Sequence, residues 1–260
     1  LTTILNTTHN ATTNWVEGVE LDARDTVLLP SVKRLIKDQL AVERTRAELI
    51  KSPALKELRE LIHIHISSHK ELGFFLISPD KKNIASMRNS NMGETNLLVN
   101  HGDYLDRLFN GEAVLVTPIR SDVPLPDVEG MLSEEEPTMF IGIPVFDNDV
   151  VIAAFTFRID PSHHFTRIVQ MARSGETGDT YAFNSDGKLI TESRFDDQLR
   201  RVGLIEAGER GILNLTVRDP GGNMLEGYKP EVALSELPLT LMTREALAGR
   251  KGMNLDGYRD

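Results

Sequence analysis

Residues 75–88 read FLISPDKKNIASMR, and residues 181–194 read YAFNSDGKLITESR. In both stretches a short apolar segment leads into a polar turn, and a second apolar segment ends on arginine. The identical positions fall where a hairpin needs its turn and strand residues: Asp80, Lys82, Ile84 and Arg88 recur as Asp186, Lys188, Ile190 and Arg194. The repeat predicts two copies of one module, each built around a β-hairpin.

The composition excludes several classes of protein. The chain has 260 residues, of which 40% are hydrophobic and 26% charged, so it can fill the core of one large domain or of two ordinary ones. A net charge of −10 argues against a nucleic-acid partner, because phosphate binding needs clustered lysine and arginine. No stretch is apolar for long enough to span a membrane. Cysteine is absent, which excludes disulfides and thiolate zinc sites.

The first 70 residues have the pattern of helices. Apolar side chains at helical spacing over 6–48 predict one long helix, bent near Pro30 because proline removes a helical hydrogen bond. A helical hairpin broken at Pro30 is the alternative. Ser52 and Pro53 resemble an N-cap followed by the first residue of a second helix, which we expect to run to about Lys70. The predicted N-terminal region is therefore 1–70.

A first β module is predicted over 71–172. Its hairpin is followed by a short helix at 103–109 that ends at Asn110 and Gly111. The proline-rich, acidic stretch 121–137 is predicted to be a loop. Asp147, Asn148 and Asp149 form a predicted turn between the last two strands. Five antiparallel strands with helices on one side are expected, at 73–78, 84–88, 113–119, 138–146 and 150–159.

A second β module is predicted over 173–260. The stretch 174–178 is expected to be a linker, and the second hairpin is expected to be followed by a helix, a strand at 212–218 and a further helix at 243–249. The predicted fold class is α+β, with a long N-terminal helix packed along two modules. Each module is expected to hold an antiparallel sheet of about five strands with flanking helices.

The segment GETGDTYAFNSDGKLITESRF (175–195) resembles the membrane-proximal half of a double Cache sensor domain, also called a tandem PAS-like or PDC sensor. The order of a long helix and two β modules is similar to that family as well. The resemblance implies a sensor outside the cytoplasmic membrane, between two transmembrane helices. Family members have further strands after the position of Tyr258, so we expect the second sheet to be incomplete here.

The resemblance also bears on the ligand. Amino-acid-binding members of the family carry an Arg-x-Trp-Tyr motif in the membrane-distal module. The one tryptophan of this chain is Trp15, which falls in the N-terminal helix. The sequence therefore argues against the amino-acid-binding subclass.

A candidate ligand site follows from strand alternation. Along 150–159, one set of side chains is bulky and apolar and is expected under helices, whereas Thr156 and Arg158 face the other way. Arginine can hold a carboxylate through two hydrogen bonds, which suits a small anion. The alternative has Arg88 and Arg158 facing solvent, or paired with Asp160 or other nearby acids. The predicted site comprises Ser86, Arg88, Phe140, Gly142, Thr156 and Arg158.

No pattern of catalytic residues is found. The sequence has no Gly-x-Ser-x-Gly nucleophile motif and no cysteine nucleophile. His65 and His69 share a helix face but lack the HExxH pattern, and we read them as surface residues. We therefore expect this chain to have no catalytic residue, no metal site and no cofactor.

Together these observations predict the periplasmic ligand-sensing region of an inner-membrane signalling protein, with a histidine kinase as its output. The kinase and the flanking transmembrane helices would lie outside this chain, and the ligand would be a small molecule. The alternatives are the sensor of a diguanylate cyclase, an adenylate cyclase or a chemoreceptor, or a secreted solute-binding protein. A homodimer through the N-terminal helices is left open.

Overall fold

The computed structural model describes residues 2–69, 73–126, 130–172 and 178–253. The chain divides into two compact units. We call Asn10–Pro161 the sheet unit, and Leu1–His9 together with Ser162–Asp260 the C-terminal unit. Helix α1 (Thr2–Leu28) contributes residues to both. The predicted boundaries at 70 and 172 stay a prediction.

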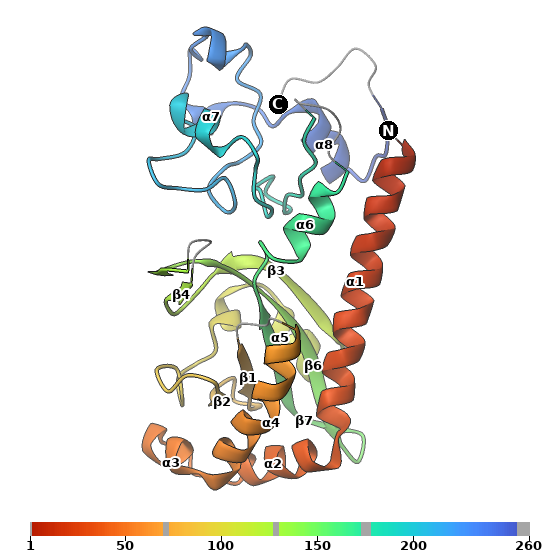
Figure 1. Cartoon of the computed structure of the whole chain (residues 1–260), viewed down its shortest axis with the longest axis vertical. Helices are drawn as coiled ribbons and strands as arrows, with labels where there is room; N and C mark the ends of the chain where they lie inside the picture. Colours follow the sequence, from red (N-terminus) through yellow and green to blue (C-terminus); the bar gives the residue numbers. More distant parts are fainter. Residues whose placement is uncertain (1, 70–72, 127–129, 173–177, 254–260) are drawn as a thin grey trace. The chain divides into compact units, whose positions relative to one another are not determined.

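The predicted single helix over 6–48 is wrong. Helix α1 ends at Leu28, and a separate helix, α2 (Pro30–Leu40), leaves it in a new direction (Figure 1). Leu29 between them has an extended ψ of 129°. Proline lacks an N–H and disfavours helical backbone in the residue before it, so the helix stops at this point. The break falls at Pro30, where the alternative placed it.

Two further helices complete the helical part of the sheet unit. Helix α3 (Arg46–Lys51) begins after Thr45, whose hydroxyl accepts a hydrogen bond from the Glu48 amide at 3.4 Å. Helix α4 (Pro53–His69) begins at the predicted proline. Helix α4 packs against both α2 and α3. The side chains that α2 and α4 bury fully include Leu35, Ile36 and Leu58.

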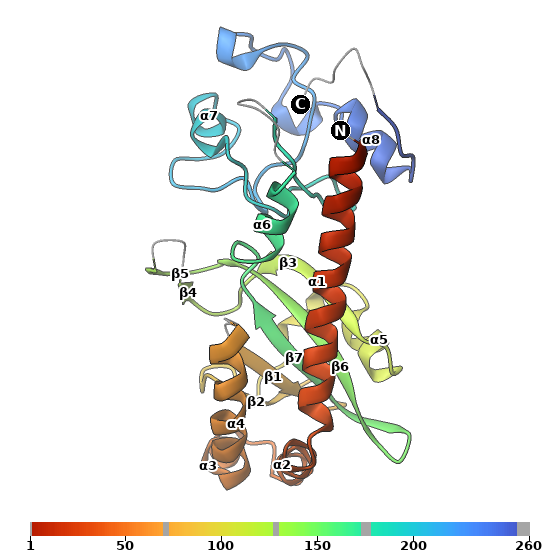
Figure 2. The ribbon, with the colours of Figure 1, turned by 45° about the vertical axis from the view of Figure 1, so that its right-hand side comes forward.

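Five antiparallel strands form one sheet in the order β2-β1-β7-β6-β3 (Figures 1 and 2). The predicted α+β class and the five strands of the first module are confirmed. The first hairpin of the repeat supplies β1 and β2 at one edge, and β7 joins that hairpin to the rest of the sheet. The strands are β1 (Gly73–Ile77), β2 (Asn83–Ser86), β3 (Val114–Arg120), β6 (Pro137–Asp147) and β7 (Val150–Ile159).

Two loops of the sheet unit can be compared with prediction: the β6–β7 turn agrees with it, and the stretch 121–137 differs. Between β6 and β7, Asn148 and Asp149 have φ of 45° and 64°, the left-handed backbone of a tight hairpin turn. The predicted loop over 121–137 instead contains a small hairpin of β4 (Leu125–Pro126) and β5 (Leu132–Ser133). Leu125 is fully buried, so the stretch has a hydrophobic anchor that a solvated loop would lack.

The short helices η1 (Leu97–Asn100) and α5 (Tyr104–Phe109) cover one face of the sheet, where α5 contacts β3, β6 and β7. Buried side chains from these helices and from the strands form a continuous apolar cluster there. The bulky set that alternation placed on the opposite face is buried as well. Phe155 lies between Phe74 and Phe157, with ring centroids 5.2 and 5.1 Å away.

Helix α2 is attached to the sheet edge by a buried side chain. The Gln39 amide donates to the Ile84 carbonyl of β2 at 2.6 Å and to the Leu49 carbonyl at 3.4 Å. Gln39→Ala should lower the free energy of unfolding by about 2 kcal/mol, because both carbonyls lose their donor in the core. Urea unfolding followed by circular dichroism measures this. The exposed Lys37→Ala on the same helix is the control, with an expected loss below about 1 kcal/mol; equal losses would contradict the assignment.

The two copies of the sequence repeat form turns of the same kind. In the first copy the Ser78 amide donates to the Lys82 carbonyl at 3.0 Å, and in the second the Asn184 amide donates to the Lys188 carbonyl at 2.9 Å. The residue before each lysine has left-handed backbone, with φ of 61° at Lys81 and 74° at Gly187. The turn of the repeat therefore recurs with the same hydrogen bonds, while the duplication of a whole module stays a prediction.

The strands predicted around the second turn are not formed. Among the described residues of the C-terminal unit, only isolated bridges occur: Phe183 with Leu189, Lys188 with Thr216, and Arg218 with Leu239. A strand needs a continuous partner, and each of these pairs stands alone. The antiparallel sheet predicted for the second module is therefore not found among the described residues.

Short helices make up the regular structure of the C-terminal unit. The helix predicted after the second hairpin and the helix predicted at 243–249 are both present, as Asp196–Arg201 and Leu241–Leu247. The predicted linker at 174–178 lies outside the described residues apart from Gly178. The helices are α6 (Phe165–Gln170), α7 (Asp196–Arg201), η2 (Met224–Glu226), η3 (Leu234–Glu236) and α8 (Leu241–Leu247).

Candidate ligand site

The antiparallel register aligns several of the predicted site residues in one row. Ser86 of β2 pairs with Phe75 of β1, Phe75 pairs with Thr156 of β7, and Thr156 pairs with Gly142 of β6. Directly opposite residues in antiparallel strands place their side chains on the same face. The row therefore lies on the face that carries η1 and α5.

Arg158 occupies the next row on the same face, paired with Phe140. The residue as a whole is only 1% exposed. The guanidinium lies over two aromatic rings, 5.2 Å from the centroid of Phe75 and 4.9 Å from that of Phe140. Aromatic faces attract cations, which offsets part of the cost of burying this charge.

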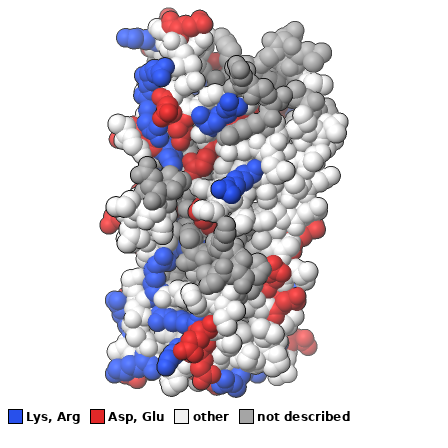
Figure 3. Space-filling view, viewed as in Figure 1, with Lys and Arg blue, Asp and Glu red and all other residues white. Residues whose placement is uncertain are grey.

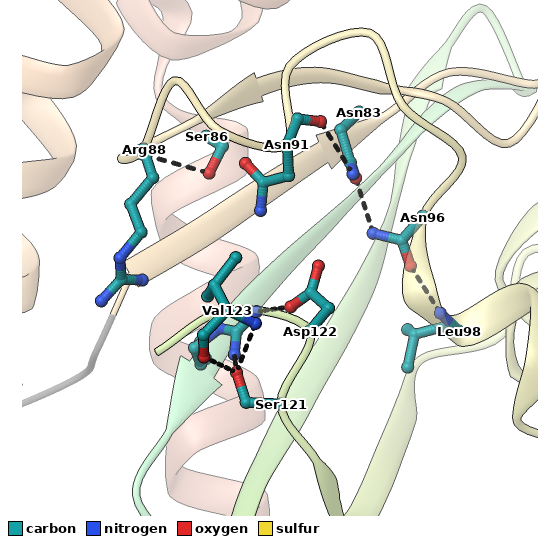
Figure 4. A network of polar contacts seen from close by, with 10 residues as sticks. Asn83, Ser86, Arg88, Asn91, Asn96, Leu98, Ser121, Asp122 and Val123 are labelled. Carbon is teal, nitrogen blue, oxygen red and sulfur yellow. Dashed lines mark hydrogen bonds and ion pairs between the residues drawn. The ribbon is translucent and has the colours of Figure 1, made fainter. Parts of the chain in front are cut away.

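The two residues that follow β3 accept hydrogen bonds from the Arg158 guanidinium. Arg158 donates from Nη1 to the Ser121 hydroxyl at 2.7 Å and from Nη2 to the Asp122 carboxylate at 2.7 Å. The Ser121 hydroxyl in turn donates to the Val123 carbonyl at 2.6 Å, which fixes its orientation (Figure 4). Burial lowers the pKa of Arg158, the Asp122 carboxylate opposes this, and the charge of Arg88 lowers it further.

Arg88 follows β2 and is half-buried. Its backbone amide donates to the Ser86 hydroxyl at 3.2 Å. Its Nη1 lies beside Gly73, the residue of β1 that pairs with Arg158. Burial lowers the pKa of Arg88, and the Asp122 carboxylate opposes this. The Arg88 guanidinium has no ion-pair partner among the described residues. Arg88 thus lies near the Arg158–Asp122 pair without an ion pair of its own in the described chain.

Several buried polar atoms on or near this face have no hydrogen-bond partner within the described part of the chain. They are the Thr138 and Thr156 hydroxyls and the Asn91 side-chain oxygen. Thr138 shares its side of β6 with Phe140, and Thr156 is two residues from Arg158. An unsatisfied buried polar group typically costs roughly 1–3 kcal/mol.

A chain of asparagines holds the loop after β2. The Asn83 amide donates to the Asn91 carbonyl at 3.2 Å, and the Asn96 amide donates to the Asn83 side-chain oxygen at 2.7 Å (Figure 4). The Asn96 oxygen also accepts from the Leu98 amide at 2.9 Å, at the start of η1. The network fixes the loop that carries Asn91 and follows Arg88.

The other end of the predicted site is closely packed. Phe140 belongs to the apolar cluster. A Cβ atom at Gly142 would lie 2.9 Å from Leu108 and 3.1 Å from Val114. The structure therefore divides the predicted set into a polar end, with Ser86, Arg88 and Arg158, and an end filled by α5.

Sequence reasoning missed four residues of this site: Phe75, Asn91, Ser121 and Asp122. It considered Asp160 as a partner for Arg158, but the partner is Asp122, which is distant in sequence. The available signal was that a buried arginine needs a carboxylate, and Ser121 and Asp122 directly follow a strand of the same sheet.

A separate cavity of about 230 Å³ lies in the C-terminal unit. Leucines 199, 204, 215 and 237 line much of it, with Arg218 as its one charged lining residue among those described. The Arg218 guanidinium donates to the Leu237 carbonyl. None of the predicted site residues contributes to this cavity.

Within the part of the chain that the structure describes, no helix is long and apolar enough to cross a membrane. No group of three or more histidine, aspartate or glutamate side chains among the described residues is placed to hold a metal ion. The side chains of His65 and His69 lie outside the description. Basic and acidic side chains are intermingled on the face drawn in Figure 3.

No protein-family model matches the chain, and no curated protein matches it. It is similar to the solved ligand-binding domain of the Pseudomonas aeruginosa PAO1 amino acid chemoreceptor PctB in complex with L-Gln, at 15% identity over 78% of this chain and 72% of that one, with a TM-score of 0.47. The sensor domain of the V. cholerae histidine kinase DctB is similar at 12% identity, over 65% of this chain and 59% of that chain, with a TM-score of 0.40. The sensory domain of the Campylobacter jejuni chemoreceptor Tlp3 with isoleucine bound is similar at 13% identity, over 73% of this chain and 70% of that chain, with a TM-score of 0.37.

Proposed function

We propose that this chain is the extracytoplasmic ligand-sensing region of a bacterial membrane signalling protein, and that its sheet unit binds a small carboxylate. The observation that carries the ligand proposal is the half-buried guanidinium of Arg88, which has no ion pair among the described residues and lies beside Gly73, the residue that pairs with Arg158. Arginine binds carboxylates through two parallel hydrogen bonds, and low local polarity strengthens such contacts.

The signalling part of the proposal is supported by the sequence resemblance over 175–195 and by helix α1, which contributes to both units. A carboxylate that binds one packing of the sheet unit better than another shifts the population toward that packing. A continuous helix can carry such a difference along the chain. We further propose a periplasmic location and a histidine kinase output.

The binding site can be tested with two four-carbon probes, butyrate and succinate. Wild-type protein should melt at a higher temperature with at least one of them, because a ligand that binds only the folded state stabilises it. Arg88→Ala should abolish this rise, since it removes the cation without an ion pair in the described chain. Arg107→Ala removes an exposed arginine that pairs with Glu112 at 2.9 Å and should keep the rise. A rise that survives Arg88→Ala would refute the site.

The output can be tested separately with the full-length protein in membrane vesicles. A histidine kinase transfers phosphate from ATP to a histidine of its own, and the ligand should change that rate. Radiolabelled ATP measures the acid-labile phosphohistidine. Production of a cyclic nucleotide in place of phosphohistidine would instead identify a cyclase and leave the ligand site unaffected.

A further inference from the structure

The charges around Arg158 do not balance. Arg158 and Arg88 each carry one positive charge, and Asp122 is the one carboxylate among the described residues that pairs with either of them. Asp122 lies 2.7 Å from Arg158, while Arg88 has no ion pair within the described residues. These three side chains thus carry a net charge of +1, in a chain whose net charge is −10.

We infer that Asp122 determines which ligands the site accepts, by setting its net charge so that a monocarboxylate fits and a dicarboxylate is rejected. The inference rests on the proposed function and adds the charge of the ligand. One ligand carboxylate neutralises the remaining positive charge. A second ligand carboxylate would have no cation left and would face Asp122, so like charges would lie close together.

The size of the effect follows from burial. Arg158 is 1% exposed and the Asp122 side chain is 26% exposed, so water screens this charge pair incompletely. Two unit charges several ångströms apart near a protein surface interact by a few kcal/mol, and salt screens them only in part. We therefore expect discrimination of about tenfold or more between one and two charges.

The charge of Asp122 can be separated from its hydrogen bond. Asp122→Asn keeps a side-chain oxygen that can accept from Arg158 Nη2, so the geometry can persist while the negative charge is removed. Ser121 continues to accept from Nη1 at 2.7 Å. A purely structural role for Asp122 would change stability without changing the preference between ligands of different charge.

The experiment measures binding of butyrate, succinate and monomethyl succinate by titration calorimetry at constant ionic strength. Wild-type protein should bind butyrate about tenfold more tightly than succinate, and monomethyl succinate more tightly than succinate. D122N should shift the succinate-to-butyrate affinity ratio about tenfold or more toward succinate. R88Q should bind neither, and the double variant R88Q with D122N should regain the preference for butyrate because its net charge is restored. Circular dichroism establishes that each variant is folded.

The outcomes separate the two claims. Binding of either probe with an unchanged ratio in D122N would overturn the inference and leave the proposed function standing. Lack of binding of all three probes to wild-type protein would overturn both. The comparison of succinate with its monomethyl ester uses wild-type protein alone, so it tests the predicted charge preference even where D122N does not fold. Tighter binding of succinate than of its ester would overturn the inference.

Discussion

Arg158→Ala should lower the free energy of unfolding by about 3 kcal/mol or more, because it empties the space between two aromatic rings in the core and leaves Asp122 without its partner. Arg158 is the largest of the fully buried side chains, and its guanidinium contacts Phe75 and Phe140. A loss of this size in a protein of this length lowers the melting temperature by about 10 °C. Differential scanning calorimetry of the full chain measures the change.

Arg158→Met separates packing from charge. Methionine fills much of the space between the rings, so it restores packing that alanine loses, but it leaves Asp122 without its cation just as alanine does. The Asp122 side chain is 26% exposed and can be hydrated once its partner is gone. We therefore expect the methionine variant to lose about 1 to 2 kcal/mol, less than the alanine variant, while losing carboxylate binding. An alanine variant as stable as the methionine variant would show that packing around Arg158 contributes little.

Gly142→Val should destabilise the sheet unit by about 2–3 kcal/mol through overpacking. Gly142 is in the middle of β6, and the first atom of any side chain there would come within 2.9 Å of Leu108 in α5 and 3.1 Å of Val114 in β3. Helix α5 would have to move away from the sheet to make room. Guanidinium unfolding measures the loss, and it should appear at a lower midpoint with an unchanged slope.

Gly18→Ala is the matched control for a glycine substitution. Gly18 lies within helix α1 and is exposed, and the position that a Cβ would occupy there has no neighbouring atom within 4 Å among the described residues. Alanine is favoured over glycine in a helix interior by about 1 kcal/mol, so this variant should be more stable than wild type. Opposite signs for the two glycines are the expected result. A stabilised Gly142→Val would contradict the close approach of α5.

Local patterns predicted most of the sheet unit. The alternation along β7 predicted that Thr156 and Arg158 lie on one face of the sheet and the bulky apolar residues on the other. The turn residues Asn148 and Asp149 predicted the position of the β6–β7 hairpin. Pro30 marked a break, but helical spacing on both sides led to the prediction of one helix. Proline's effect on the preceding residue outweighed the periodicity, because a local steric clash cannot be relieved by packing elsewhere.

Sequence could not supply the partner of a buried charge. Arg158 and Asp122 meet because β3 and β7 belong to one sheet with β6 between them, and only the assembled sheet brings the end of β3 close to Arg158. For the same reason the prediction of a complete second hairpin was wrong, because only its turn is formed. The turn at Asn184 and Gly187 forms from local hydrogen bonds, whereas its strands need neighbours that local sequence does not specify.

The two copies of the turn differ in how much variation each can accept. Lys81 and Gly187 hold the same left-handed backbone, yet the lysine side chain reaches an exposed ion pair with Asp106, whereas a Cβ at Gly187 would lie 2.8 Å from Leu239. The first copy therefore tolerates a side chain at this position, whereas packing excludes one from the second. At Gly187 the chain that follows the turn adds a steric requirement for glycine to the preference that the left-handed backbone already has.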